Sequence, residues 1–205
     1  NREKSHVANT VALFVCFSAY GQGAFVYDQQ SSDESNIGEG RAVIQTSQPI
    51  GQSFAPTLST IGFIRLYLSD GSFDGLGATV FVNLRIDSII GPVLASTDPV
   101  SMPDRLTSTA NFLFPTAVSL TPGTTYYFQP VLQSGDTTFS VSGHNAFNYA
   151  GGTGFFFGQP SQSTDLWFRE GIIIPEPSSA VLGLAGFGVL LDASLAKHFR
   201  KRARG

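Results

Sequence analysis

The sequence is poor in charged residues, cysteine and histidine. Charged side chains make up 13% of its 205 residues, about half of the roughly 25% that is typical of a soluble domain. Hydrophobic residues, in contrast, make up 42% and aromatic residues 12%. A disordered chain has the opposite composition, with high charge and few aromatics. We therefore expect a folded body.

The scarcity of cysteine and histidine excludes several kinds of catalytic site. The single cysteine, Cys16, and two of the three histidines, His6 and His198, lie in the terminal segments. His144 is then the one imidazole of the body, and a zinc site needs more ligands than that. The sequence also has no Gly-x-Ser-x-Gly motif, which would mark a serine nucleophile. We predict no catalytic residue, no metal and no cofactor. Spacing does not exclude a carboxylate pair for glycoside hydrolysis, so a glycan-active enzyme is kept as an alternative.

Lysine is absent from the body of the chain and occurs at the two ends, at Lys4, Lys197 and Lys201. Residues 25–174 contain five arginines and twelve acids, a net charge of −7, whereas residues 175–205 carry a net charge of +3. A nucleic-acid-binding domain needs a basic face of its own. An acidic body with a basic end therefore argues against nucleic acid as a partner.

The N-terminal segment has the order of a secretory signal peptide. Two cationic residues precede an apolar run at residues 11–17, and small residues follow. This run is too short to span about 30 Å of hydrocarbon. We predict a signal peptide over residues 1–24, cut after Gly21 or after Ala24; the alternative is a buried N-terminal strand.

The C-terminal segment, residues 174–205, has three parts in a fixed order. Pro175, Glu176 and Pro177 come first, and an apolar run rich in small residues follows at 180–196. As a helix this run is about 26 Å long, the lower limit for a membrane span. The cationic cluster that would stop transfer comprises Lys197, Arg200, Lys201, Arg202 and Arg204.

This tail resembles the PEP-CTERM sorting signal of exosortase-processed bacterial proteins. The resemblance implies export, transient anchoring in the inner membrane by a transmembrane helix, and cleavage near the Pro-Glu-Pro motif by an exosortase-type membrane protease. Asp192 departs from the family pattern, because that helix is usually apolar. The alternative is an ordinary terminal helix packed on the domain.

Between these ends, residues 25–173 consist of short β-type segments separated by Gly, Pro and Asp. Apolar and polar residues alternate best in residues 79–87 and 61–68, and no window carries a helical stripe. We predict an all-β fold, an antiparallel β-sandwich or jelly roll. The predicted strands are Ala24–Tyr27, Gln52–Ala55, Ile61–Ser69, Thr79–Asp87, Phe112–Leu120, Thr124–Leu132 and Asp165–Ile174.

The body also resembles a broad group of exported bacterial β-sandwich domains. The residues that carry this resemblance are 51–56, 120–126 and 165–170. The resemblance implies a lectin-like or carbohydrate-binding-like jelly roll.

One strand offers a candidate glycan-binding face. In a strand over residues 165–171, Leu166 and Phe168 point to one side and Asp165, Trp167 and Arg169 to the other. If the first side is the core, an indole lies outside between a carboxylate and a guanidinium, which suits a sugar. The alternative is that Trp167 is buried, as tryptophans usually are.

The loop from Asp70 to Gly75 has two interpretations. Its oxygens match the first half of an EF-hand loop, but position 12 is Phe81 where a bidentate Glu completes the calcium site. The simpler interpretation is a hairpin turn stabilised by Asp and Gly.

Together these features predict an exported protein of the cell surface or extracellular matrix with a structural or interaction role. Its precursor would be anchored in the membrane. The alternative is a glycan-binding module or glycan-active enzyme of the cell surface, with an extracellular polysaccharide as partner.

Overall fold

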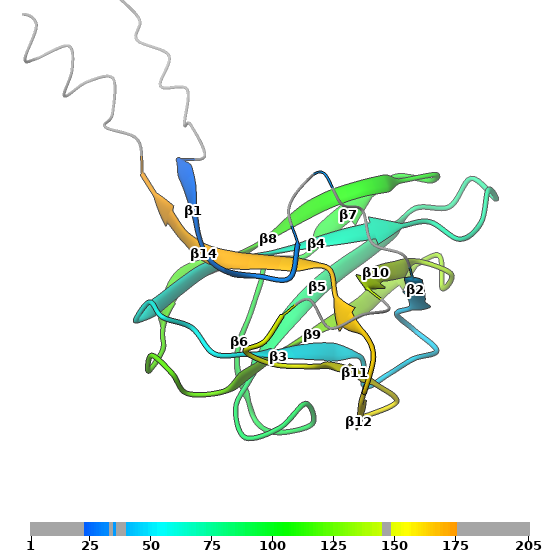
Figure 1. Ribbon diagram of the computed structural model, residues 1–205. Helices are drawn as coiled ribbons and strands as arrows, with labels where there is room; N and C mark the ends of the chain where they lie inside the picture. The colour runs from blue at the N-terminus through cyan, green and yellow to red at the C-terminus, as the bar shows by residue number, and fades with distance from the viewer. Residues whose placement is uncertain (1–22, 33–34, 36–39, 145–148, 176–205) are drawn as a thin grey trace, which may run out of the picture. The chain divides into compact units, whose positions relative to one another are not determined.

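A computed structural model of the chain describes residues 23–32, 35, 40–144 and 149–175. Residues Ala24–Ile174 form a compact body of β-strands (Figure 1). Within the described ranges there is no helix, and hence none that could cross a lipid bilayer. The predicted signal peptide, the sorting tail beyond Pro175 and the basic cluster lie outside these ranges, apart from Gly23 and Ala24.

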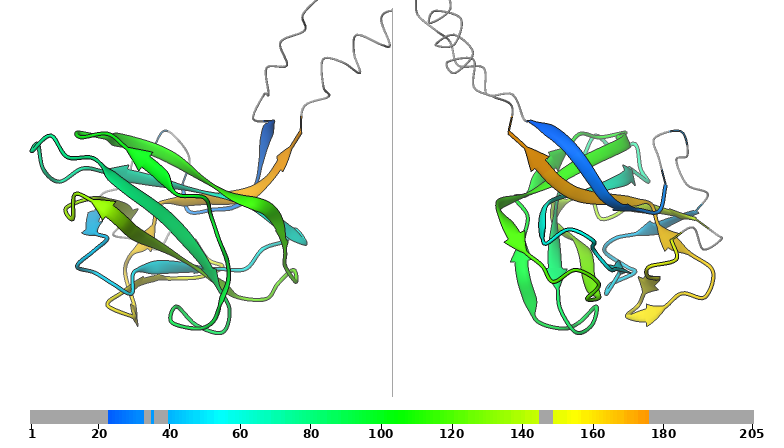
Figure 2. Two further views of the ribbon diagram at one scale, coloured as in Figure 1. Left: turned by 180° about the vertical axis from the view of Figure 1, so that it is seen from behind. Right: turned by 60° about the vertical axis from the view of Figure 1, so that its left-hand side comes forward.

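The first of two antiparallel sheets is built around β4 (Thr60–Ser69). One edge of β4 pairs with β8, and the other pairs with β14 and then with β10. β1 pairs with β14, and the two run side by side in Figure 2. The other strands of this sheet are β1 (Ala24–Gln30), β2 (Gly40–Val43), β8 (Thr107–Ser119), β10 (Ser140–His144), β13 (Asp165–Leu166) and β14 (Phe168–Ile174).

The second sheet has the order β12-β11-β3-β9-β5-β6, with β7 paired to the same edge of β5 as β6. All of its pairings are antiparallel. Its strands are β3 (Gly51–Phe54), β5 (Ala78–Arg85), β6 (Val93–Ser96), β7 (Val100–Met102), β9 (Tyr126–Gly135), β11 (Gly154–Phe156) and β12 (Gln159–Pro160).

The alternation predicted for the two longest apolar segments is confirmed. One face of each strand points into the shared core, because successive residues of a strand point to opposite faces. Burial itself alternates on β5, whereas the second face of β4 is covered too, as the full burial of Phe63 shows. The buried set is Val80, Val82 and Leu84 on β5 and Ile64, Leu66 and Leu68 on β4. These side chains belong to one hydrophobic cluster, so the two sheets share a core, as the predicted antiparallel all-β fold requires.

Aromatic rings from both sheets meet in this core. The ring of Phe168 on β14 lies 6.5 Å from that of Phe54 on β3 and 5.2 Å from that of Phe128 on β9, centroid to centroid. All three side chains are fully buried. Tilted aromatic pairs at such distances add attraction beyond their buried area. This cluster therefore fastens β14 to the opposite sheet.

The predicted turn at Thr121–Gly123 is present. The amide of Thr124 donates to the carbonyl of Thr121 at 3.1 Å, and Gly123 has a φ of 75°. A positive φ at the third position is the property of a type II turn, which favours glycine there. The turn joins the end of β8 to β9.

The predicted continuous strand over residues 165–174 is wrong in one respect. It is interrupted at Trp167, so that β13 pairs with β10 whereas β14 pairs with β4 and β1. The backbone amide of Trp167 donates to the carbonyl of Ser142 at 2.9 Å. The break lets the two halves of one segment pair with different strands of the sheet, a feature that local periodicity does not encode.

Candidate functional site

Asp165, one of the three predicted glycan-binding residues, is buried between the sheets. Its Oδ1 accepts a 2.8 Å hydrogen bond from Nε2 of Gln52 on β3, and its Oδ2 accepts a 3.1 Å bond from the amide of Tyr149. The amide of Leu166 in turn donates to Oε1 of Gln52 at 2.9 Å. Neither Gln52 nor Asp165 is exposed. This carboxylate therefore joins the sheets and does not face solvent.

Trp167 is also fully buried. Its ring meets that of Tyr67 edge to face, with 5.9 Å between centroids. Tyr67 lies on the face of β4 opposite the shared core, and it is only 9% exposed. Of the two alternatives for Trp167, the structure has the buried one, so the indole is not an open platform for a sugar.

Arg169 is the one predicted glycan-binding residue that is not buried, and it lies on the outer face of the first sheet. Its guanidinium lies 3.4 Å from the ring centroid of Tyr27, and its Nε donates to Oε1 of Gln30 at 2.9 Å. Arg65 donates to the Tyr27 hydroxyl at 3.5 Å and to Oγ1 of Thr109 at 2.9 Å. Arg169 thus makes a cation–π contact with the ring of Tyr27, and Arg65 contacts the hydroxyl of the same residue.

The Asp70–Gly75 loop is held by its own carboxylates. Oδ1 of Asp70 accepts from the amide of Ser72 at 2.8 Å, and Oδ2 accepts from the amide of Arg105 at 2.7 Å. Hydrogen bonds from the amide and hydroxyl of Thr138, aided by the hydroxyl of Ser72, lower the pKa of Asp136 to about 2. No group of three potential metal-ligating side chains occurs among the residues that the structure describes. The hydrogen bonds to Asp70 support the predicted turn chemistry. The predicted hairpin is wrong, because this loop connects β4 of the first sheet to β5 of the second.

Glu170 is a buried acid that the sequence did not single out. It is 1% exposed, and neither carboxylate oxygen has a hydrogen-bond partner within the described structure. Burial, reinforced by the charge of Asp28, raises the pKa of Glu170 to about 8, although the nearby backbone amide of Gln29 opposes the shift. This carboxyl is therefore mostly protonated at neutral pH.

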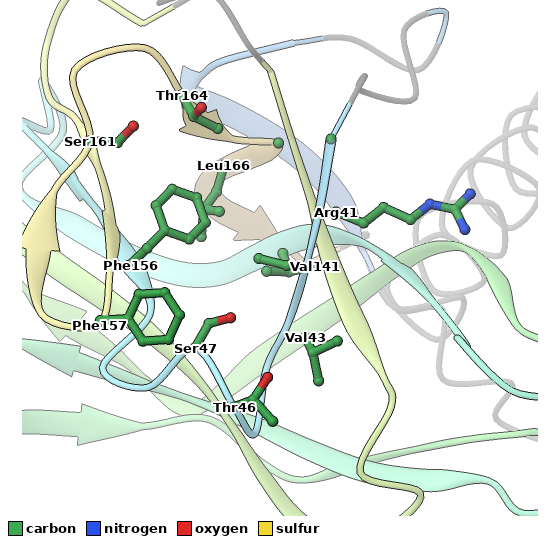
Figure 3. A pocket seen from close by; sticks show the side chains of 13 residues that line it. Arg41, Val43, Thr46, Ser47, Val141, Phe156, Phe157, Ser161, Thr164 and Leu166 are labelled. Atoms are coloured by element: carbon green, nitrogen blue, oxygen red, sulfur yellow. The ribbon is translucent and has the colours of Figure 1, made fainter.

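A cleft of about 430 Å³ opens between β2 of the first sheet and the β11–β12 hairpin of the second (Figure 3). We call it the side cleft. The core residues Val141 and Leu166 line its inner part, and the rings of Phe156 and Phe157 stand on the side of the hairpin. The side chain of Arg41 extends away from both rings (Figure 3).

The hairpin beside the side cleft presents Phe157 in an unusual conformation. Phe156 pairs with Gln159, so Phe157 and Gly158 form a two-residue loop, with φ values of 54° and 73°. Positive φ at both positions defines a type I′ turn, in which the first position favours Asn or Gly. The amide of Phe157 donates to the carbonyl of Ser47 at 2.9 Å, and that of Gly158 to Pro49 at 2.8 Å. These bonds hold the backbone at the tip of the hairpin, and the ring of Phe157 that it carries is 66% exposed.

No protein-family model matches this chain, and a search of curated proteins finds no match. The chemistry of these surfaces therefore rests on their own geometry. Sequence reasoning missed the side cleft, because its walls come from segments about 100 residues apart. The one local signal was three consecutive phenylalanines, residues 155–157, within a stretch rich in Gly, Asn and Gln.

Proposed function

We propose that this protein is exported to the cell surface or extracellular matrix, where it has a non-enzymatic structural or interaction role. The observation that carries the proposal is the order of features after Ile174: Pro175, Glu176 and Pro177, then an apolar run, then the basic cluster of Lys197, Arg200, Lys201, Arg202 and Arg204. An apolar segment followed by cationic residues favours retention of those residues in the cytoplasm. The signal peptide over residues 1–24 would begin the export.

In this proposal the tail acts twice. It first anchors the precursor in the inner membrane through its apolar helix, and it is then cut near Pro175–Pro177 by an exosortase-type membrane protease. The lysine-free body, with its net charge of −7, would be the part that is released or attached outside. Low charge and an antiparallel two-sheet body suit a lectin-like jelly roll of the kind found in exported proteins.

The non-enzymatic part of the proposal is supported by what the acids of the body do. Asp165 joins the two sheets, and Asp70 and Asp136 hold turns. Asp28 accepts hydrogen bonds from the amides of Thr57 and Leu58 at 2.7 and 3.0 Å. Each of these carboxylates therefore has a structural task.

Fractionation of the producing cells tests the proposal. We expect to recover the native chain in the surface or matrix fraction. The amount recovered there should change when the chain lacks the basic cluster. A comparison strain without its exosortase-type protease should accumulate the longer precursor in the inner membrane. Recovery of the native chain in the cytosol, with both ends retained, would contradict the proposal.

A glycan-binding module is the second candidate, and one observation favours it. The side cleft has an exposed aromatic ring at its edge, which is the kind of surface on which a sugar ring can stack. This candidate concerns what the body binds and does not depend on how it is exported.

A further inference from the structure

We propose that the side cleft binds a neutral saccharide and that the ring of Phe157 is the surface on which a sugar unit stacks. This inference rests on the second candidate function, a glycan-binding module, and names its site and its ligand class. It places the site away from Trp167, at the opening between β2 and the β11–β12 hairpin.

The backbone of Phe157 has an unfavourable conformation. A bulky side chain at a φ of 54° is rare, because its Cβ crowds the backbone in the left-handed region. Asn or Gly would form the same type I′ turn at lower cost. A strained backbone that exposes a large apolar ring does not serve folding, and such strain is often stored at functional sites.

The backbone at the tip of the hairpin is held by the rest of the body. The hydrogen bonds to Ser47 and Pro49 tie the tip of the hairpin to the segment that follows β2. The backbone that carries Phe157 is therefore already held at the cleft before a ligand arrives, and the tip of the hairpin loses little freedom on binding. A ring on a free loop would lack this advantage.

The lining of the side cleft matches the two sides of a sugar ring. Its volume of about 430 Å³ is within the usual range of ligand pockets, which are largely apolar with a few polar groups. Val141, Leu166 and Phe156 supply the apolar part, and Thr46, Ser47 and Thr164 supply hydroxyls. A saccharide has a face of C–H groups, which is attracted to the electron-rich face of an aromatic ring, and an edge of hydroxyls.

The charges of the side cleft and of the body favour a neutral sugar over an acidic one. Arg41 is the single charged residue that lines the side cleft, and its side chain extends away from the phenylalanine rings (Figure 3). The body as a whole is negative, with a net charge of −7, and would repel a polyanion. A wholly apolar ligand fits less well, because it would strip water from the hydroxyls without replacing their hydrogen bonds.

Affinity electrophoresis of the full chain, kept in mild detergent, tests this inference. The gels contain a neutral polysaccharide (dextran, galactomannan or hydroxyethyl cellulose) or the polyuronate alginate. The variants are Phe157→Ala and Phe157→Asn, and the matched control is Phe73→Ala, because Phe73 is 75% exposed but does not line the side cleft. Thermal unfolding of each variant is recorded in parallel.

We expect at least one neutral polysaccharide to retard the native chain. Both Phe157 variants should bind it roughly 3- to 10-fold more weakly, and Phe73→Ala should bind as the native chain does. Phe157→Asn should also unfold at an equal or higher temperature, since Asn suits the turn. No retardation by any neutral polysaccharide, retardation by alginate alone, or retardation unchanged in both Phe157 variants would overturn the inference. None of these outcomes bears on export, which fractionation tests separately.

Discussion

Gln52 and Asp165, 113 residues apart in the sequence, hold the two sheets together through a buried hydrogen bond of 2.8 Å. The amide group of Gln52 is used at both ends, because its oxygen also accepts from the backbone of Leu166. A bond between an amide and a carboxylate is stronger than one between neutral groups. This pair thus fixes how β13 lies against β3.

Replacement of Gln52 by Leu should destabilise the fold by about 3 kcal/mol, because the change leaves the Asp165 carboxylate and the Leu166 amide buried without this partner. Urea unfolding of the full chain, followed by the fluorescence of Trp167, measures the effect. Gln159→Leu is the control, since Gln159 is exposed on β12. A loss for Gln52→Leu below about 0.5 kcal/mol, the range of ordinary surface changes, would contradict this role.

The buried carboxyl of Glu170 should make stability fall as the pH rises. Its pKa is raised from an ordinary value of 4.5 to about 8 in the folded chain, so the unfolded chain loses this proton first. The resulting loss of stability begins near pH 4.5, grows by up to about 1.4 kcal/mol per pH unit, and levels off above about pH 8.

Glu170→Gln removes this titration and keeps the shape of the side chain. We expect the variant to be more stable than the native chain at pH 9 and to differ less from it at pH 4. Melting temperatures across this pH range provide the comparison. Parallel pH profiles for the two chains would show that Glu170 does not titrate in this way.

Because the sequence has a single tryptophan, its fluorescence reports directly on the burial of the Trp167 side chain. Trp167 is fully buried against Tyr67, so its emission should be blue-shifted in the native chain and resist quenching by iodide. Denaturant should shift the emission to the red and restore quenching. Quenching of the native chain as strong as that of free tryptophan would contradict the buried position.

The sorting proposal predicts the behaviour of a change in the Pro-Glu-Pro motif. Glu176→Ala should slow cleavage of the tail and leave a larger, membrane-bound precursor in the producing cells, whereas the nearby change Ser179→Ala should leave processing unchanged. Immunoblots of membrane and surface fractions measure the ratio of the two forms. Equal processing of both variants would show that Glu176 is not part of the motif that the protease recognises.

Much of the fold could be predicted because local alternation reflects burial directly. Alternation in the segments of β4 and β5 predicted correctly which of their side chains point into the core. The residue types around Gly123 predicted the turn there. Short strands such as β2, β6 and β11 were missed, since three or four residues carry little periodicity, although β3, which is as short, was predicted. The break at Trp167 was missed because the pairing partners of β13 and β14, and not their own residues, determine it.

The candidate site was less predictable for the same reason. Leu166 and Phe168 were correctly placed toward the core. The burial of Asp165 and Trp167, however, depends on Gln52 and Tyr67 from distant strands and on Tyr149 from the segment between β10 and β11. Alternation within one strand shows which residues share a side. It does not show whether another layer covers that side.

The most direct test of the export proposal is the intact mass of the mature protein purified from the cells that produce it. The proposal predicts that the chain begins at Gln22 or Phe25 and ends near Pro175–Pro177, without the basic cluster. A purified protein that still carries residues 1–21 and the cationic residues from Lys197 to Arg204 would contradict it.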